Sequence, residues 1–348
     1  MLDIDGAVEA SWPDEGVAAH YGDPLREQRV MAAEGALVDR SNRGVITVTG
    51  PDRLSWLHSL TSQHLEQLKP GQTAQALILN PQGHLEHHLT LADDGSTTWI
   101  HVEPGTAPAV AAYLDSMRFM LRVQVQDASE RYALLSFAGG LPDGAVARAF
   151  TDLGGVAMME GPFCSDVVIE RDGIAAAPEK LGLPVAGIWA LEAARIAAHV
   201  ARPGLDTDHK TLPHEVGLIE PAVHLNKGCY RGQETVARVH NLGHPPRRLV
   251  FLHLDGSVDR LPAHGSPVTR GPQGDEVGFV GSAALHYELG PIGLGLVKRS
   301  VPVQATLLAD GVAAGQEVIV SPEAGGNVKV TLRRDSVPQP PAAARKLI

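Results

Sequence analysis

Hydrophobic and polar positions alternate in short runs along the first third of the chain, and turn residues separate the runs. Residues 45–49 are mostly β-branched and predict a strand. Gly50-Pro51-Asp52 follows and predicts a helix start, because proline suits the first turn of a helix. Leu54, Leu57 and Leu60 then recur at three-residue spacing and place one apolar stripe on that helix.

Three further hydrophobic runs cover residues 76–79, 84–91 and 98–102, with the turn clusters Pro81-Gln82-Gly83 and Asp93-Asp94-Gly95 between them. Two turns between three runs predict an antiparallel meander. The spacing of apolar residues predicts a helix over 108–121, and strands are expected at 123–125 and 132–137. This order indicates an α+β layer and not a parallel, doubly wound sheet.

The pattern changes again in the second half of the chain. Residues 138–245 mix a short strand at 167–169 with a helix at 189–200. After Pro245-Pro246, only short runs between Gly/Pro turns occur, at 249–254, 265–269, 278–284, 293–297 and 318–321. We therefore predict a small all-β module over 246–335, either a barrel or a sandwich. The Pro- and Ala-rich residues 336–348 predict a disordered tail.

Length and charge narrow the class of protein. A chain of 348 residues suggests two or three domains, and its net charge of −11 argues against nonspecific binding to nucleic acid or anionic membrane. No apolar run approaches the roughly 20 residues that span a bilayer, and the first residues lack the pattern of a signal peptide. The two cysteines, Cys164 and Cys229, provide no disulfide framework. We expect a cytoplasmic protein with no direct nucleic-acid or membrane partner.

The candidate chemistry centres on Cys229, which lies between the cations Lys227 and Arg231 and between the glycines Gly228 and Gly232. Nearby cations favour thiolate over thiol, and a helix that starts after the loop would favour it further. Glycines allow turn conformations and close approach of a ligand. The alternative interpretation is a small buried cysteine with no reactive role.

The charge around this cysteine differs from that of the whole chain. Residues 227–248 contain five basic residues against one acid, a net charge of +4. A basic cluster on an acidic protein indicates an anionic small ligand more than a polymer. His84, His87 and His88 also cluster, but a zinc site needs three or four convergent ligands and we predict no metal.

Residues 227–234, Lys-Gly-Cys-Tyr-Arg-Gly-Gln-Glu, resemble the K-G-C-[FY]-x-G-Q-E signature of the YgfZ family. These are folate-binding proteins related to the aminomethyltransferase (T-protein, GcvT) of the glycine cleavage system. Residues 48–57, 80–85, 213–215 and 278–294 also resemble the family, so the similarity extends over most of the chain.

The resemblance implies an α+β fold with three domains in a cloverleaf around a folate-sized channel. Two domains would be α+β, the first discontinuous (1–44 with 130–245) and the second spanning 45–129, and the third would be the small β-barrel at 246–335. The expected ligand is tetrahydrofolate or a folate derivative. Asn80, Glu86 and Glu215 are the channel residues that this resemblance implies.

The resemblance also implies a role in the assembly or repair of iron–sulfur enzymes, including those that modify tRNA. The partners would be iron–sulfur clients or assembly proteins. Cys229 would be the nucleophile or a transient cluster ligand. The expected supporting residues divide into four roles: thiolate stabilisation by Lys227 and Arg231, turn shape from Gly228 and Gly232, attachment of the loop to the next helix by Gln233 and Glu234, and contact with an anionic ligand group by Arg238. Tyr230 belongs to the same motif and ligand loop.

Two departures from the T-protein pattern bear on the activity. Glu86-His87 stand where T-proteins carry an Asp-Asp pair, and Arg195-Ile196-Ala197-Ala198-His199 replaces R-L-E-A-G, so the carboxylate that holds the pterin is absent. A lost charge-assisted hydrogen bond costs about 1.5–3 kcal/mol. We therefore do not expect classical aminomethyltransferase activity. Whether the protein is an enzyme stays open, with two alternatives: a tetrahydrofolate-dependent one-carbon transferase that uses Glu86, or a scaffold for a non-folate anionic heterocycle.

Overall fold

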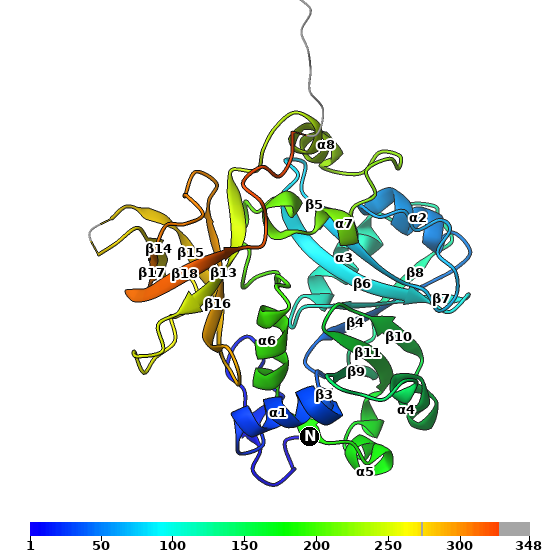
Figure 1. The fold of residues 1–348 in the computed structure, drawn as a ribbon. Coiled ribbons are helices and arrows are strands. Elements are labelled where there is room, and N and C mark those ends of the chain that lie inside the picture. Colours follow the sequence, from blue (N-terminus) through cyan, green and yellow to red (C-terminus); the bar gives the residue numbers. More distant parts are fainter. Residues whose placement is uncertain (273, 327–348) are drawn as a thin grey trace, which may run out of the picture.

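The computed structural model describes residues 1–272 and 274–326. Within these ranges the chain forms two five-stranded sheets, a closed six-stranded barrel and a small two-stranded sheet, β1 (Val8–Glu9) with β2 (Ala18–His20). Figure 1 shows the barrel on one side and the two five-stranded sheets, with their helices, on the other. The predicted α+β class with a C-terminal barrel is confirmed.

The first five-stranded sheet is antiparallel and has the order β5-β6-β7-β4-β8. Its strands and helices are β4 (Gly44–Thr49), α2 (Arg53–Leu60), β5 (Thr73–Leu79), β6 (Leu85–Asp93), β7 (Thr97–Val102), α3 (Ala107–Ser116) and β8 (Gln124–Asp127). The predicted meander is therefore present. One face of the sheet packs on the two helices through Ile46, Ile78, Leu57 and Leu114, all buried.

The helix predicted over 108–121 ends earlier, at Ser116. Phe119 has a left-handed backbone (φ 48°), which a continuing α-helix cannot accommodate. Phe119 and Met120 are 90% and 97% exposed, so these apolar residues, which the sequence assigned to the helix, lie in an exposed loop.

The second five-stranded sheet is built from chain segments that precede and follow the first sheet in the sequence. Its order is β10-β11-β9-β3-β12, and Leu37 pairs with Phe137 across β3 and β9. Only the β3–β12 pair in this sheet is parallel. The elements are α1 (Pro24–Glu34), β3 (Ala36–Asp39), β9 (Tyr132–Ala138), α4 (Ala145–Leu153), β10 (Ala157–Glu160), β11 (Cys164–Glu170), η1 (Arg171–Gly173), α5 (Ala177–Leu181), β12 (Val185–Ala186) and α6 (Ile188–Ala197).

The barrel contains β13 (Arg247–Leu254), β14 (Pro267–Thr269), β15 (Glu276–His286), β16 (Gly290–Lys298), β17 (Leu307–Ala309) and β18 (Val312–Val318). Sequence reasoning missed β17 and placed the last strand at 318–321 instead of 312–318. The sequence does carry a signal for this hairpin, because Asp310-Gly311 is a typical turn dipeptide. In the structure both residues have positive φ and form a two-residue hairpin turn. The predicted tail at 336–348 lies outside the described residues.

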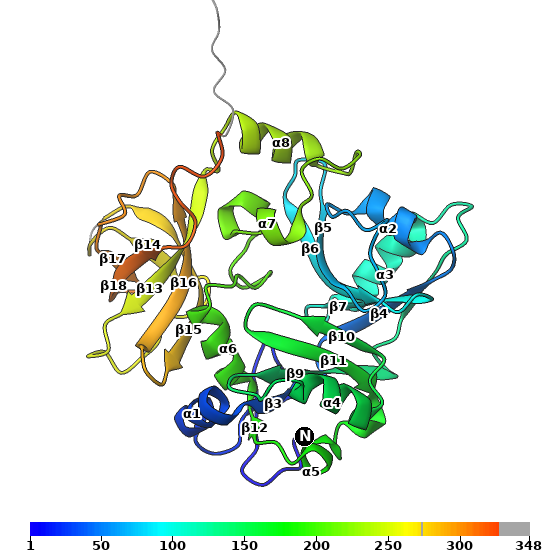
Figure 2. The same ribbon diagram turned by 45° about the vertical axis from the view of Figure 1, so that its right-hand side comes forward.

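The segment between α6 and the barrel connects the three units. It contains η2 (Pro213–Val216), α7 (Ile219–Ala222) and α8 (Gln233–Asn241). Figure 2 shows α7 and α8 between the barrel and the sheet edge formed by β5 and β6. One buried cluster includes Leu77 of β5, Ile196 of α6, Val236 of α8 and Phe251 of β13, so the three units share a core here. Among the described residues, no helix is long and apolar enough to cross a membrane.

Candidate functional site

Cys229 is exposed on the loop that precedes α8, and Lys227, two residues before it, anchors this loop. The Lys227 ammonium is buried and donates hydrogen bonds to the carbonyl oxygens of His58 and Thr61, the latter at 2.5 Å. These carbonyls lie at the C-terminal part of α2, where a cation is favoured. Burial lowers the pKa of Lys227 to about 8. Lys227 therefore fastens the loop to α2 instead of presenting its charge to solvent beside the thiol.

The other end of the loop is fixed by Gln233 and Gly232. Gln233 Nε2 donates to the Lys227 carbonyl oxygen at 3.2 Å, which closes the loop onto the start of α8. Gly232 precedes α8 with φ 83°, and a Cβ atom there would lie 2.6 Å from the Asn80 carbonyl oxygen. A Cβ atom on Gly83 would lie 2.8 Å from Thr235 Cβ. The cysteine loop and the 80–83 hairpin therefore pack backbone to backbone.

Gly232→Ala is expected to lower the free energy of unfolding by about 1–3 kcal/mol, because alanine is strained at positive φ and would collide with the hairpin. The matched control is Gly228→Ala in the same loop, which has no heavy atom within 4 Å of an added Cβ and no positive φ. That control should change the free energy by less than about 0.5 kcal/mol. Urea unfolding of both variants measures the difference; equal losses would contradict the packing described.

The cluster of five cations does not form one anion site. Arg231 pairs with Glu86 at 3.2 Å, and Arg247 pairs with Asp208 at 2.7 Å and with Glu215 at 2.9 Å. Arg248 is wholly buried and donates to the carbonyl of Val301 and to Gln316. Glu234 and Arg238 are exposed on α8. Most of these cations are therefore paired or buried, because net charge along a sequence does not count the acids that the fold supplies. The contact of Arg238 with an anionic ligand group stays a prediction.

The three predicted channel residues have local structural contacts. Asn80 Oδ1 accepts from the backbone N–H groups of Gln82 and His84 and so shapes the hairpin turn. Glu215 is wholly buried and accepts from the Leu212 N–H and from Arg247. Glu86 pairs with Arg231 outside the cavity described below. None of Asn80, Glu86 and Glu215 lines the cavity, so their expected role in a folate channel stays a prediction.

A cavity of about 1010 Å³ lies where the three units meet. Its wall combines residues of β6, β7 and β11 with the segments 199–203, 214–226 and 319–325. The wall segment that ends at Asn226 continues directly into Lys227, so the cysteine loop begins at the edge of this cavity. Cys229 itself is not among the lining residues.

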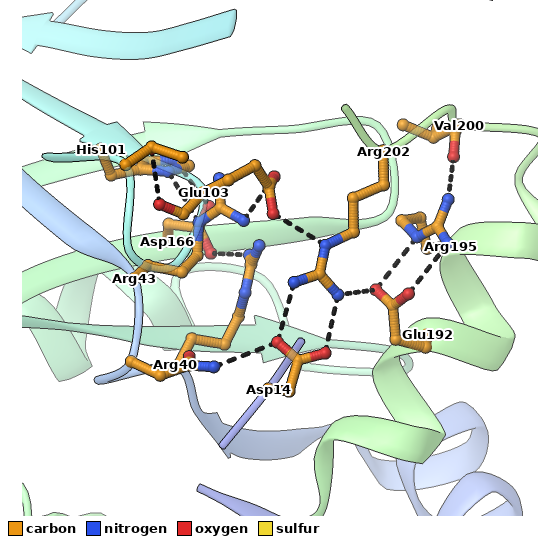
Figure 3. A network of polar contacts seen from close by, with 12 residues as sticks. Asp14, Arg40, Arg43, His101, Glu103, Asp166, Glu192, Arg195, Val200 and Arg202 are labelled. Atoms are coloured by element: carbon orange, nitrogen blue, oxygen red, sulfur yellow. Dashed lines mark hydrogen bonds and ion pairs between the residues drawn. The ribbon is translucent and has the colours of Figure 1, made fainter. Parts of the chain in front are cut away.

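A buried network of charged residues lines one part of the cavity (Figure 3). Arg202 forms a two-pronged ion pair with Asp14, with both N–O distances 2.8 Å, and its Nε donates to Glu103 at 2.8 Å. Arg43 donates to the other Glu103 oxygen at 2.7 Å and to His101 Nδ1 at 3.1 Å. These contacts join the N-terminal segment, β7 and the segment after α6.

The network continues to Asp166, whose carboxylate lies 3.2 Å from Arg40 and 3.3 Å from His101 Nε2. Burial alone would raise the pKa of Asp166, but Arg40, His101 and Ser136 together outweigh it and hold the pKa well below its usual range. Arg43 and Arg202 do the same for Glu103. Burial lowers the pKa of His101 to about 4. The carboxylates are therefore ionised and paired, and they are poorly placed to act as a general base.

Arg195, at the start of the stretch that departs from the T-protein pattern, belongs to the same network. It pairs with Glu192 at 2.9 Å and with Asp206 at 2.8 Å, and it donates to Ser282 of the barrel at 2.6 Å. Burial would raise the pKa of Glu192, but Arg195 and Arg202 lower it to about 2. Sequence reasoning missed this network because residues in direct contact, such as Asp14 and Arg202, lie up to 188 residues apart in the sequence.

The second cysteine is buried, and the clustered histidines do not converge on one point. Cys164 is buried, and burial raises the pKa of its thiol well above the usual value. His88 lines the cavity and contacts Gln75 at 2.9 Å, while His84 precedes β6. In residues 1–272 and 274–326, no group of three or more His, Cys, Asp or Glu side chains is arranged to hold a metal.

Comparison with known proteins defines the class to which the fold belongs. Residues 19–157 match the family model described as the GCVT N-terminal domain. The structure resembles glycine cleavage system aminomethyltransferase T from Bartonella henselae with a TM-score of 0.76 at 20% identity, covering 91% of this chain and 94% of that one. The fold is therefore aminomethyltransferase-like, and the family match covers residues 19–157 of it.

Curated relatives at low identity fall into two groups. An aminomethyltransferase of Nostoc sp. is 28% identical over 303 residues, covering 78% of this chain and 79% of that protein. The mitochondrial iron–sulfur cluster assembly factor IBA57 homolog of Mycosarcoma maydis is 28% identical over 230 residues, covering 61% of this chain and 55% of that protein. The proteins to which the chain is similar thus include both an aminomethyltransferase and an iron–sulfur cluster assembly factor homolog.

Proposed function

We propose that this protein is a YgfZ-like, folate-binding accessory protein that supports the assembly or repair of iron–sulfur enzymes, including enzymes that modify tRNA. The observation that carries the proposal is the exposed Cys229, held on a loop that Lys227 and Gln233 fix at both ends. The similarity to an iron–sulfur cluster assembly factor supports the same role. Thiolate is a soft ligand suited to iron–sulfur clusters, so an exposed cysteine can bind a cluster or its iron transiently.

The loop is also open to a large partner. Nothing lies within 4 Å of a Cβ atom built on Gly228, the residue beside Cys229. Gly228, Cys229 and the preceding Asn226 and Leu225 are all exposed. A protein client can therefore approach the sulfur atom from solvent without rearrangement of α8 or α2.

The cavity has the size and the wall for a folate-related ligand. Its volume of about 1010 Å³ lies at the upper end of the range for small-molecule sites, and aliphatic residues make up much of its wall. Ala197 provides no carboxylate to anchor a pterin ring, so the polar contacts must come from other residues. A bound folate would either carry a one-carbon group or act as an effector. The residues of this chain would orient the folate and exclude water.

The alternative is a tetrahydrofolate-dependent one-carbon transferase, which the fold similarity over 91% of the chain favours. Its acid would be Glu86, but the structure pairs Glu86 with Arg231 away from the cavity. The purified protein, given tetrahydrofolate and an aminomethyl donor, distinguishes the two functions. Robust turnover that Glu86→Gln abolishes would establish the transferase, whereas the accessory role predicts no turnover.

The accessory role itself is tested in cells that lack the native gene. These cells receive the wild-type protein, Cys229→Ser or Cys164→Ser, and the activity of an iron–sulfur enzyme is measured in the extract. We expect the wild type and Cys164→Ser to restore the activity and Cys229→Ser to fail.

A further inference from the structure

Arg248, on β13 of the barrel, is a wholly buried arginine whose N–H groups are only partly satisfied by the described residues. Its Nη2 donates to the Val301 carbonyl oxygen at 3.1 Å and to Gln316 Oε1 at 2.7 Å. Its Nε and Nη1 are also buried, and no described residue accepts a hydrogen bond from them. Buried polar groups in proteins are nearly always paired, so this guanidinium needs a further acceptor.

The other buried arginines show what Arg248 lacks. In residues 1–272 and 274–326, every other buried arginine lies within 3.2 Å of a carboxylate oxygen: Arg40, Arg43, Arg53, Arg195 and Arg202. Arg248 forms no ion pair with a described acid, and burial lowers its pKa with no carboxylate to oppose the effect. An arginine side chain does not lose its proton in a protein, so a positive charge is buried here without a negative partner.

The position of Arg248 in the barrel explains why the fold supplies no acid. Arg248 lies on the same face of β13 as Val250 and Leu252, because side chains alternate along a strand. Both of these residues belong to the apolar core of the barrel. The one other buried polar side chain among the described barrel residues is Ser282, which donates to Asp206 outside the barrel. The described interior of the barrel therefore contains no carboxylate.

One end of the barrel is covered by the segment 299–306, which connects β16 to β17. Gln316 Nε2 donates to the carbonyl oxygens of Pro302 at 3.0 Å and Ala305 at 2.9 Å, and the Arg248 contact fastens the same segment. Most residues of the segment are themselves exposed. The guanidinium thus lies one layer of chain beneath the surface, and local opening of this segment gives a small ion a route to it.

The missing partner must supply both hydrogen-bond acceptors and negative charge. Water would complete the hydrogen bonds but would leave the buried charge uncompensated, and an uncompensated charge is costly in an apolar interior. The partner must also be small, because Arg248 does not line the large cavity between the three units and its neighbours are closely packed aliphatic residues. A monoatomic anion meets both conditions, whereas a phosphate ester or a nucleotide is too large.

We propose that the barrel end beneath the segment 299–306 binds one halide ion, chloride under ordinary conditions, through Nε and Nη1 of Arg248. The ion accepts hydrogen bonds from these groups and neutralises the guanidinium, and the segment closes over it. This site is separate from Cys229 and from the large cavity, and it does not rest on the proposed function. Because the ion binds the folded barrel, chloride should stabilise the protein by mass action.

Thermal unfolding of the full chain in two salts tests this site. Sodium chloride and sodium gluconate at the same concentration screen charges equally, so a difference between them reports specific binding of the small anion. The midpoint should be about 2 °C higher in about 200 mM chloride than in gluconate. Cys229→Ser should show the same difference, so a failure of the iron–sulfur role would not affect this result.

Two arginine variants of the barrel locate the effect. Arg248→Met keeps the length of the side chain and removes the charge, so it should abolish the difference between the salts. Its midpoint in gluconate should be no lower than that of the wild type, because the uncompensated charge is gone. Arg260→Met is the control: Arg260 is exposed and pairs with Asp310 at 2.5 Å, so this variant should keep the wild-type difference.

A crystal of the wild-type protein grown in sodium bromide gives a second measurement that needs no variant. Anomalous scattering should place a bromide ion in contact with Nε or Nη1 of Arg248. The proposal is overturned if the two salts give equal midpoints, if the difference persists in Arg248→Met, or if the map shows only water beside the guanidinium. A bromide ion there without any effect in solution would be an adventitious ion only, which also overturns it.

Discussion

Cys229→Ser is expected to remove nearly all of the protein's support for iron–sulfur enzymes in cells. Serine keeps the size of the side chain, and the exposed position places no packing demand on it, so the loop should keep its structure. A serine hydroxyl is a hard ligand and stays protonated, so it replaces neither the thiolate ligand nor the thiolate nucleophile. Activity of an iron–sulfur enzyme in extracts should fall to the level of cells without the gene, while a cluster-free enzyme in the same extract should stay unchanged.

The two cysteines of this chain provide a matched control. Cys164 is buried beside Asp166 and Arg40, and its Sγ lies 3.7 Å from the Asp166 carboxylate. Cys164→Ser should therefore affect stability at most and leave the cellular activity restored. Equal amounts of each variant must be shown by immunoblot. Full restoration by Cys229→Ser at wild-type abundance would refute the role proposed for this thiol.

Arg202→Leu should produce the largest loss of stability among single substitutions in the cavity network. Arg202 is 5% exposed and is the partner of both Asp14 and Glu103. Its removal leaves those carboxylates buried without the guanidinium that offsets their negative charge. Breaking a buried ion pair in this way typically costs about 3–5 kcal/mol. Because the contacts join segments 188 residues apart, the loss should appear in the cooperative unfolding of the chain in urea.

Arg122→Leu is the control for this effect. Arg122 pairs with Asp52 at 2.8 Å, with comparable geometry, but its side chain is 73% exposed. Exposed ion pairs contribute little because water solvates both partners after the pair is broken. Arg122→Leu should therefore change the urea midpoint far less than Arg202→Leu. Similar midpoints for the two variants would mean that the buried network does not hold the three units together.

Much of the fold can be predicted from the sequence because its signals are local. β-branched runs and turn clusters placed the strands of the first sheet and of most of the barrel. The early end of α3 could not be predicted in this way, since Leu121 keeps the helical spacing of apolar residues although the helix ends at Ser116 and the backbone at Phe119 is left-handed. The hairpin at Asp310-Gly311 was missed although its turn dipeptide is a strong local signal.

The candidate site could be predicted only in part. The spacing of cysteine and glycines identified the loop, and the fold shows Cys229 exposed and Gly232 packed against the 80–83 hairpin. Charge summed along the chain overstated the unpaired positive charge, because the fold brings Asp208 and Glu215 into ion pairs with Arg247. In the segment 213–215 the sequence favoured Glu215 as the functional residue. In the structure Glu215 accepts hydrogen bonds from Leu212 and Arg247, and His214 lies on the cavity wall.

Alkylation of the folded protein tests the central claim, a reachable thiol at Cys229, most directly. Brief treatment with iodoacetamide, followed by peptide mass spectrometry, should show modification at Cys229 and none at Cys164, whereas both should react in urea. Loss of labelling in Cys229→Ser would assign the adduct. Protection of Cys229 in the folded protein, or equal labelling of Cys164, would contradict the account.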